Sequence, residues 1–228
     1  MSSDITVVLA HGAWADGSSW GKVIDALEQT GVRAIAAPLP LTTYEDDVAA
    51  LDRTLDHVGG PVVLAGHAYA GGVIGATRAP NVRALVYVAA LAPDEGETIA
   101  DVFGRGTPHP QAPALTPDAH GLLWLPDEAF ANAFAPNATP EEQARLRALQ
   151  RPISGACITV PVGRPLWKDV PTWYLLATQD RMIVADNQRF MAARMNADVR
   201  SFDVDHTPSV TAPEVVTELL LEAVRKVA

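Results

Sequence analysis

The stretch that most constrains this chain is PVVLAGHAYAGG, residues 61–72, in which an apolar run passes through small residues into a helical pattern. It predicts a buried strand, a sharp turn and a helix. Gly66 and Ala70 stand two residues before and after the centre of the turn, where only a small residue fits. This arrangement is typical of a nucleophile elbow. Its central position holds Ala68, which has neither hydroxyl nor thiol and cannot attack a carbonyl group.

The rest of the chain alternates between strand and helix patterns. We expect further strands at residues 5–10, 32–36, 82–89, 172–177 and 199–204, and helices at residues 44–58, 69–78, 185–195 and 212–227, with a first helix capped by Ser18 or Ser19. Such alternation predicts a parallel sheet with helices on both faces, because right-handed crossovers place the helices there. The expected fold class is α/β.

This alternation breaks between residues 94 and 168. The segment is rich in proline and contains two predicted helices, at residues 127–134 and 140–150. Long loops without structure are uncommon in compact domains, so we interpret the segment as a helical cap inserted between core strands. We expect the cap to cover the site, within a single domain that spans residues 1–228.

The composition of the chain indicates which kinds of binding partner to expect. A formal net charge of -10 disfavours nucleic acid and anionic membrane surfaces, which leaves a small-molecule substrate as the expected partner, and a homo-oligomer stays open. The single cysteine, Cys157, excludes an internal disulfide and is expected to pack rather than react. The opening MSSDITVVLAHG lacks a basic region and a long apolar run, so we expect no signal peptide, no membrane span and a cytoplasmic location.

Two polar residues follow predicted strands late in the chain. Asp180, in ATQDRMI, comes just after strand 172–177, and His206, in DVDHTPS, comes just after strand 199–204. In open α/β sheets ligands bind at the carboxyl ends of the strands, so we expect both side chains near Ala68. The order along the chain is elbow, acid and base.

These segments, together with HGAW at residues 11–14, resemble the α/β-hydrolases, and especially the compact branch that includes plant methylesterases and hydroxynitrile lyases. The resemblance covers nearly the whole chain except segment 94–168. It implies the α/β-hydrolase fold, with a mostly parallel sheet of about six strands flanked by helices.

The resemblance also implies roles for individual residues. His206 would be the general base, and Asp180 would orient its imidazole. The backbone N–H groups of Ala13 and Tyr69 would form an oxyanion hole, which stabilises negative charge on a substrate oxygen.

Further residues are candidates for the substrate pocket. Gly12 would let its loop approach the substrate, while Trp14, Trp124 and Tyr44 could line the pocket or belong to the core.

Other polar residues offer weaker candidates. Asp94 occupies an alternative acid position, although its context PDEGET also suits a turn, and His67 is expected to pack beneath the elbow. His109 and His120 lie in the predicted cap without metal-ligand spacing. No metal site and no cofactor are therefore implied.

Three functional readings stay open because of Ala68. In the first, the scaffold hydrolyses a small ester or lactone, and alanine replaces serine in an inactive form, such as an engineered variant. In the second, alanine is native, and His206 with Asp180 works without a covalent step, as in a lyase, in carbon–carbon bond cleavage or in direct activation of water. In the third, the protein is a noncatalytic binder of a small ligand.

Overall fold

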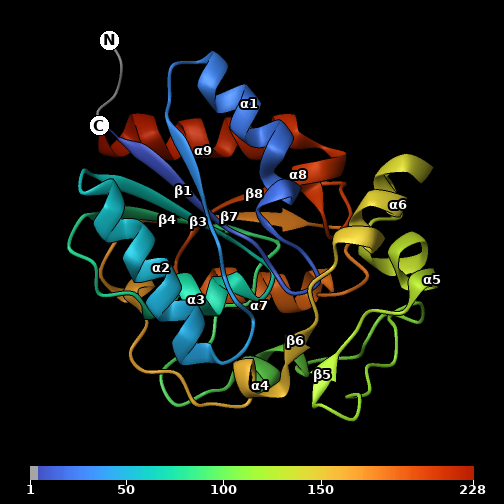
Figure 1. Ribbon diagram of the computed structural model, residues 1–228. Coiled ribbons are helices and arrows are strands. Elements are labelled where there is room, and N and C mark those ends of the chain that lie inside the picture. The colour runs from blue at the N-terminus through green and yellow to red at the C-terminus, as the bar shows by residue number, and fades with distance from the viewer. Residues whose placement is uncertain (1–4) are drawn as a thin grey trace.

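The centre of the molecule is a parallel sheet. The computed structural model describes residues 5–228 (Figure 1), and within them six strands pair in the order β2-β1-β3-β4-β7-β8. Every neighbouring pair is parallel. The strands are β1 (Thr6–Ala10), β2 (Ala34–Ala37), β3 (Val62–His67), β4 (Val82–Val88), β7 (Thr172–Ala177) and β8 (Asp198–Phe202). The expected α/β class is confirmed.

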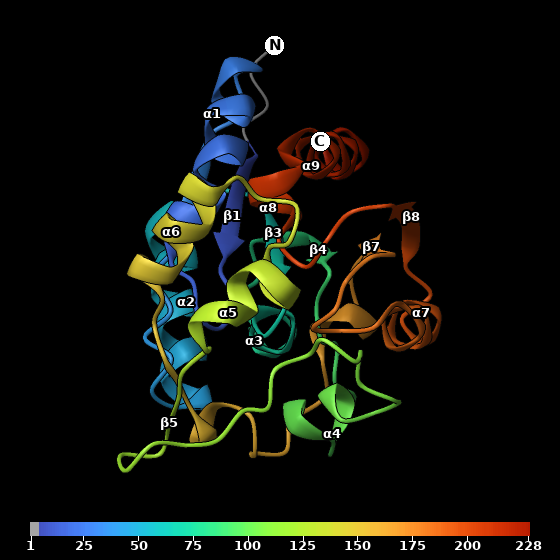
Figure 2. The same cartoon turned by 90° about the vertical axis from the view of Figure 1, so that its right-hand side faces the viewer.

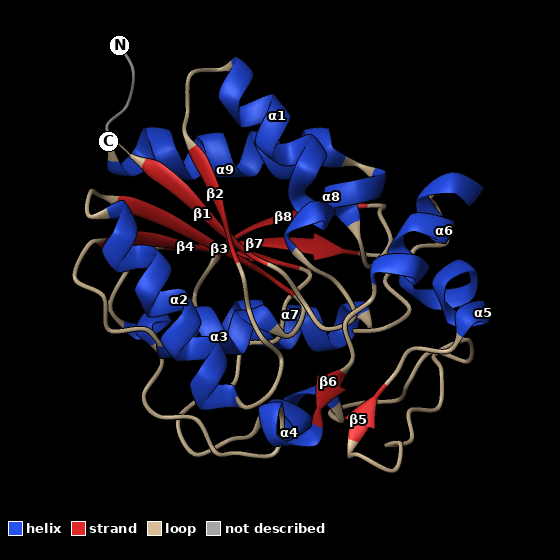
Figure 3. Cartoon of the chain, in the orientation of Figure 1, coloured by secondary structure: helices blue, strands red, loops and turns tan. Residues whose placement is uncertain are grey.

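Helices cover both faces of this sheet. On one face lie α1 (Gly21–Gln29) and α9 (Pro213–Val227), and on the other lie α2 (Tyr44–Val58), α3 (Ala70–Ala76) and α7 (Ala185–Arg194), with the strands between them (Figure 3). Successive side chains of a strand point to opposite faces. Val7 and Leu9 therefore join the core beneath α1 and α9, whereas Val8 and Ala10 join the core beneath α2 and α3.

Several expected elements differ in their bounds from the observed ones, the second strand and the last helix among them. The expected strand 32–36 is β2, which begins only at Ala34. The expected helix 212–227 is replaced by α8 (Pro208–Thr211) and α9, because Ala212 between them is not helical, with φ of -147° and ψ of 56°. Proline disfavours the helical conformation in the residue before it, and Pro213 follows Ala212.

The segment between β4 and β7 contains more structure than the sequence predicts. Its elements are α4 (Ile99–Phe103), β5 (Leu122–Leu123), α5 (Asp127–Ala129), a π-helical turn (Phe130–Phe134), α6 (Pro140–Leu149) and β6 (Ile153–Ser154). Strands β5 and β6 pair in antiparallel fashion, and α4, β5 and β6 were not expected. Short 3-10 helices are η1 (Gly17–Trp20), η3 (Gly155–Cys157) and η4 (Leu166–Lys168). Figure 2 shows α5 and α6 in front of the sheet, while α4 lies apart from them at the lower end of the view.

Two kinds of feature are absent from residues 5–228. No helix there combines the length and hydrophobicity that a membrane crossing needs. No group of three or more potential metal ligands occurs in that range. The expectation about a signal peptide rests partly on residues 1–4, which lie outside the described residues.

Candidate active site

The elbow forms where β3 passes into α3. Ala68 has φ of 49°, in the left-handed region that residues with a Cβ rarely adopt. Hydrogen bonds hold this conformation, because the Ala68 carbonyl accepts from the backbone N–H groups of Gly71 (3.1 Å) and Leu91 (2.9 Å). Ala68 lines an apolar cavity at this edge of the sheet, so the elbow presents a methyl group there.

The small residues around the elbow are required by close contacts. A Cβ on Gly66 would lie 2.9 Å from the carbonyl oxygen of Ala70, and a Cβ on Gly71 would lie 2.2 Å from that of Leu91. A Cβ on Gly12 would lie 3.0 Å from the Cβ of Ala68. The loop after β1 therefore packs directly against the elbow, whereas the approach of Gly12 to a substrate stays a prediction.

His206 and Asp180 meet at this site. The Nδ1 atom of His206 lies 2.8 Å from Oδ2 of Asp180, and both side chains are buried. The carboxylate also accepts hydrogen bonds from the backbone N–H groups of Met182 (2.7 Å) and Ile183 (2.9 Å) and from the side chain of Gln188 (2.9 Å). A carboxylate held in this way accepts the proton of Nδ1, which leaves Nε2 as the nitrogen that can take a proton.

His67 supports His206 from behind. Its Nε2 atom lies 2.6 Å from the backbone carbonyl oxygen of His206, and the two ring centroids are 4.8 Å apart. Burial is the main cause that lowers the pKa of His67 to about 3, so the ring is neutral and donates from Nε2. The expectation that His67 packs beneath the elbow fits this geometry.

The proposed oxyanion-hole residues lie side by side on the cavity wall. Ala13 and Tyr69 both line the cavity, and no acceptor for either backbone N–H occurs among residues 5–228. On the reverse side of the peptide group between Gly12 and Ala13, Nδ1 of His11 donates to the Gly12 carbonyl at 3.0 Å. The two N–H groups therefore have the geometry of free donors.

A buried carboxylate, Asp47 of α2, lies behind the elbow. The hydroxyl of Tyr69 donates to its Oδ2 at 2.6 Å, and the backbone N–H of Leu41 donates to its Oδ1 at 2.7 Å. Burial raises the pKa of Asp47, and it raises the pKa of the neighbouring Cys157 thiol to about 12. Cys157 is packed and unreactive in this environment, as the sequence suggested.

Sequence reasoning missed Asp47 because it stands in the acidic run EDD, which is typical of the first turn of an exposed helix. Its spacing from the apolar residues of the same helix could have indicated that it is buried. Asp47 stands four residues before Leu51 and eight before Leu55, on the buried stripe of α2.

The cavity has a volume of about 110 Å³ and is almost entirely apolar. Besides Ala68 and His206, its lining consists of Ala13, Trp14, Tyr69, Leu91, Ile99, Ala100, Phe103, Leu115, Leu123, Ile153, Ile158, Met182 and Ile183. None of these lining residues is Lys, Arg, Asp or Glu. Many of them belong to the segment between β4 and β7.

The two candidate tryptophans differ in position. Trp14 lines the cavity, and its indole nitrogen donates to the Leu123 carbonyl at 2.9 Å. The prediction that Trp124 lines the pocket is wrong, because its side chain is 47% exposed and donates to Asp118 on the surface. Tyr44 does not line the cavity either, since its hydroxyl donates to the Gly72 carbonyl within the core.

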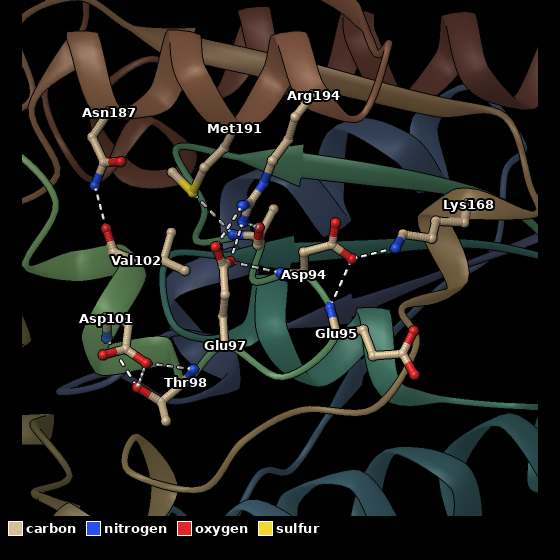
Figure 4. Close-up of polar contacts among 11 residues, drawn as sticks. Asp94, Glu95, Glu97, Thr98, Asp101, Val102, Lys168, Asn187, Met191 and Arg194 are labelled. Carbon is tan, nitrogen blue, oxygen red and sulfur yellow. Dashed lines mark hydrogen bonds and ion pairs between the residues drawn. The ribbon is translucent and has the colours of Figure 1, made fainter.

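The remaining candidates lie away from His206. Asp94 forms an ion pair with Lys168 and accepts a hydrogen bond from the backbone of Glu95 (Figure 4). Asp180, rather than Asp94, therefore meets His206. His109 and His120 lie in the segment between β4 and β7 and do not line the cavity.

The parallel sheet, the elbow and the acid–base pair at the strand ends together define the architecture of an α/β-hydrolase. The profile described as "Alpha/beta hydrolase family" matches residues 7–219, so the chain belongs to that family. A comparison with curated proteins finds no match.

Solved structures share this fold at low sequence identity. A pyrethroid hydrolase from Sphingobium faniae JZ-2 is 21% identical, with a TM-score of 0.83 and coverage of 97% of this chain and 98% of that chain. A mutant of polyneuridine aldehyde esterase is 18% identical, with a TM-score of 0.82 and coverage of 96% and 98%. A variant of tomato methylketone synthase I, complexed with beta-ketoheptanoate, is 18% identical, with a TM-score of 0.82 and coverage of 98% of both chains.

Proposed function

We propose that this protein is an enzyme in which His206 and Asp180 perform general acid–base chemistry on a small carbonyl substrate without a covalent intermediate. One observation carries the proposal. The hydrogen-bonded pair opens onto an apolar cavity in which the elbow presents the methyl group of Ala68 instead of a nucleophile.

The geometry supports a defined proton path. The Nε2 atom of His206 takes a proton from the substrate, and Asp180 stabilises the imidazolium that forms. The N–H groups of Ala13 and Tyr69 stabilise the negative charge on the substrate oxygen. With a β-hydroxy ketone, removal of the hydroxyl proton breaks the adjacent carbon–carbon bond and gives a carbonyl product and an enolate. His206 then returns its proton to the enolate carbon, so that the reaction needs no co-reactant.

Magnitudes favour this reading over serine-type hydrolysis by the chain as it stands. Loss of a triad nucleophile leaves roughly 10³ to 10⁴-fold acceleration over water. An esterase with Ala68 would therefore be almost inactive. The tomato neighbour supports reactions beyond hydrolysis on this fold, since its name describes a synthase and its complex contains a keto acid.

Ester or lactone hydrolysis is the second candidate. It is supported by the left-handed φ of Ala68 and the unpaired N–H groups beside it, which are what a serine at this position would require. The pyrethroid hydrolase and the esterase among the neighbours also carry hydrolytic names. In this reading, Ala68 silences a scaffold that is otherwise ready for catalysis.

One panel of substrates separates the candidates. The native protein, His206→Ala and Ala68→Ser are assayed side by side on short-chain esters, lactones and β-hydroxy ketones, with correct folding checked by circular dichroism. The proposal predicts turnover by the native protein that falls by about 10² to 10⁴-fold in His206→Ala. Activity only in Ala68→Ser, together with labelling by a serine-directed phosphonate, would support the hydrolase instead. Turnover by none of the three would contradict both.

A further inference from the structure

Two buried carboxylates flank the cavity. Asp180 lies directly behind His206, and Asp47 lies directly behind Tyr69, each in hydrogen-bond contact with a residue of the cavity wall. Both carboxylates are buried. Neither forms an ion pair with a lysine or arginine anywhere in residues 5–228, so no full positive charge offsets them at close range.

Two cations near α4 are already paired with acids, and a third, Arg105, which follows α4, lies over the Phe190 ring outside the cavity lining. Arg194 pairs with Glu97, and Lys168 pairs with Asp94, as Figure 4 shows. Both pairs lie outside the cavity lining. A carboxylate placed in the cavity would lose its hydration and meet no lysine or arginine, only the imidazole of His206 and the N–H groups of Ala13 and Tyr69, which is unfavourable.

Asp47 is the more unusual of the two carboxylates, because it has no histidine partner. Its two oxygens each accept a hydrogen bond, one from a phenol and one from a backbone N–H. Both hydrogen bonds favour the ionised carboxylate, which has only acceptor sites, whereas burial opposes them and raises its pKa. Its carboxylate is fully buried, and it contacts the cavity wall through Tyr69, which lines the cavity.

We propose that the cavity selects uncharged carbonyl compounds and rejects carboxylates, and that Asp47 is a determinant of this charge selectivity. The substrate class refines the proposed function. The volume of about 110 Å³ is somewhat below the ~150 Å³ that holds benzene, and the cavity opens to the surface, so a small ligand of roughly six non-hydrogen atoms or fewer fits. A keto acid such as the one bound by the tomato neighbour is then a poor ligand for this chain.

Three probes of matched size and shape test the selectivity. Pentan-2-one, butanamide and butyrate differ in one terminal group, and only butyrate is charged. Ligand-observed NMR titration of the full chain should show the ketone and the amide binding at least ~100-fold more tightly than butyrate. Ala100→Phe, which fills the cavity, should abolish binding of both neutral probes. Butyrate affinity equal to that of pentan-2-one, or no binding of either neutral probe, overturns the proposal.

A pair of adjacent variants tests Asp47 itself. Asp47→Asn removes the buried charge and should narrow the ratio between pentan-2-one and butyrate by roughly tenfold. Asp46→Asn makes the same change of net charge at the neighbouring exposed position and should leave the ratio unchanged. Equal effects of both variants, or no effect of either, would overturn the role of Asp47. If Asp47→Asn fails to fold, the three probes on the native protein still decide the selectivity.

This experiment is independent of turnover. Absence of any reaction with intact, charge-selective binding would contradict the proposed function and leave the inference standing. Turnover of a carboxylate substrate with tight butyrate binding would contradict the inference alone.

Discussion

Single residues without a side chain let the backbone segments of the site approach one another. The Ala68 carbonyl accepts two hydrogen bonds, and one of its donors, Leu91, comes from the chain that follows β4. That approach leaves no room at Gly71, where a Cβ would lie 2.2 Å from the Leu91 carbonyl oxygen. The shape of the elbow therefore depends on glycine at this position.

We expect Gly71→Ala to destabilise the protein by about 3 kcal/mol or more, because backbone rather than a mobile side chain blocks the new methyl group. Urea unfolding measures the free energy. Gly21→Ala is the control, since a Cβ there meets nothing within 4 Å, and it should stabilise α1 by about 0.5 kcal/mol. Equal stability of the two variants would contradict the packing argument.

Sequence reasoning predicted the positions of Ala68, Asp180 and His206 because each follows a strong strand pattern at the same edge of the sheet. It did not find Asp47, whose burial depends on Tyr69 and on the loop at Leu41. Local sequence cannot reveal such a contact between distant segments.

Among the elements, α4 forms one wall of the cavity through Ile99, Ala100 and Phe103. Its first turn is closed by a capping box between Thr98 and Asp101. Its last turn is hydrogen-bonded to a side chain of α7. Figure 4 shows Asn187 pointing at the Val102 carbonyl, to which its Nδ2 donates at 2.7 Å. The position of the wall is therefore set by a helix far along the chain.

We expect Asn187→Ala to lower stability by about 1 to 3 kcal/mol, because the buried Val102 carbonyl loses its side-chain donor. Release of the last turn of α4 should also weaken pentan-2-one binding in the cavity. Thermal unfolding and NMR titration measure the two effects. Asp186→Ala next to it removes only an exposed ion pair with Arg189 and should change stability by less than about 0.5 kcal/mol. An Asn187→Ala protein as stable as this control would count against the anchor.

The core elements were predictable within a few residues, because their apolar periodicity is long and regular. The five residues of α4 are too short for a helical period to show. The two-residue strands β5 and β6 form only through pairing between residues thirty or more positions apart. Tertiary contacts, rather than local propensity, define these parts of the segment between β4 and β7, and Trp124 was misplaced for the same reason.

On the scale of the whole molecule, two buried neutral histidines near the site make the free energy of unfolding depend on pH. Burial is the main cause that lowers the pKa values of His67, to about 3, and of His11. In the unfolded chain these rings take up protons near the usual value of about 6.5. Between pH 6.5 and pH 3 the unfolded state therefore binds more protons than the folded state, and stability falls as the pH falls.

For His67 alone we expect a slope of about 1.4 kcal/mol per pH unit below pH 6, measured by urea unfolding across a pH series. His67→Gln retains a donor for the His206 carbonyl but does not titrate, so the slope should become shallower by about this amount. His57→Gln, at an exposed position of α2, should leave the slope unchanged. A native slope that His67→Gln does not alter would show that other groups control acid unfolding.

Hydrogen bonds also connect the segment between β4 and β7 to the elbow. The backbone N–H of Ser154 donates to the Leu41 carbonyl, the N–H of Leu41 donates to Asp47, and Asp47 accepts from Tyr69 beside the reacting position. The segment is therefore not an interchangeable module. Exchange of residues 94–168 for those of a relative would alter the elbow as well as the cavity wall. Such an exchange would therefore change the binding preference and the catalytic geometry at the same time.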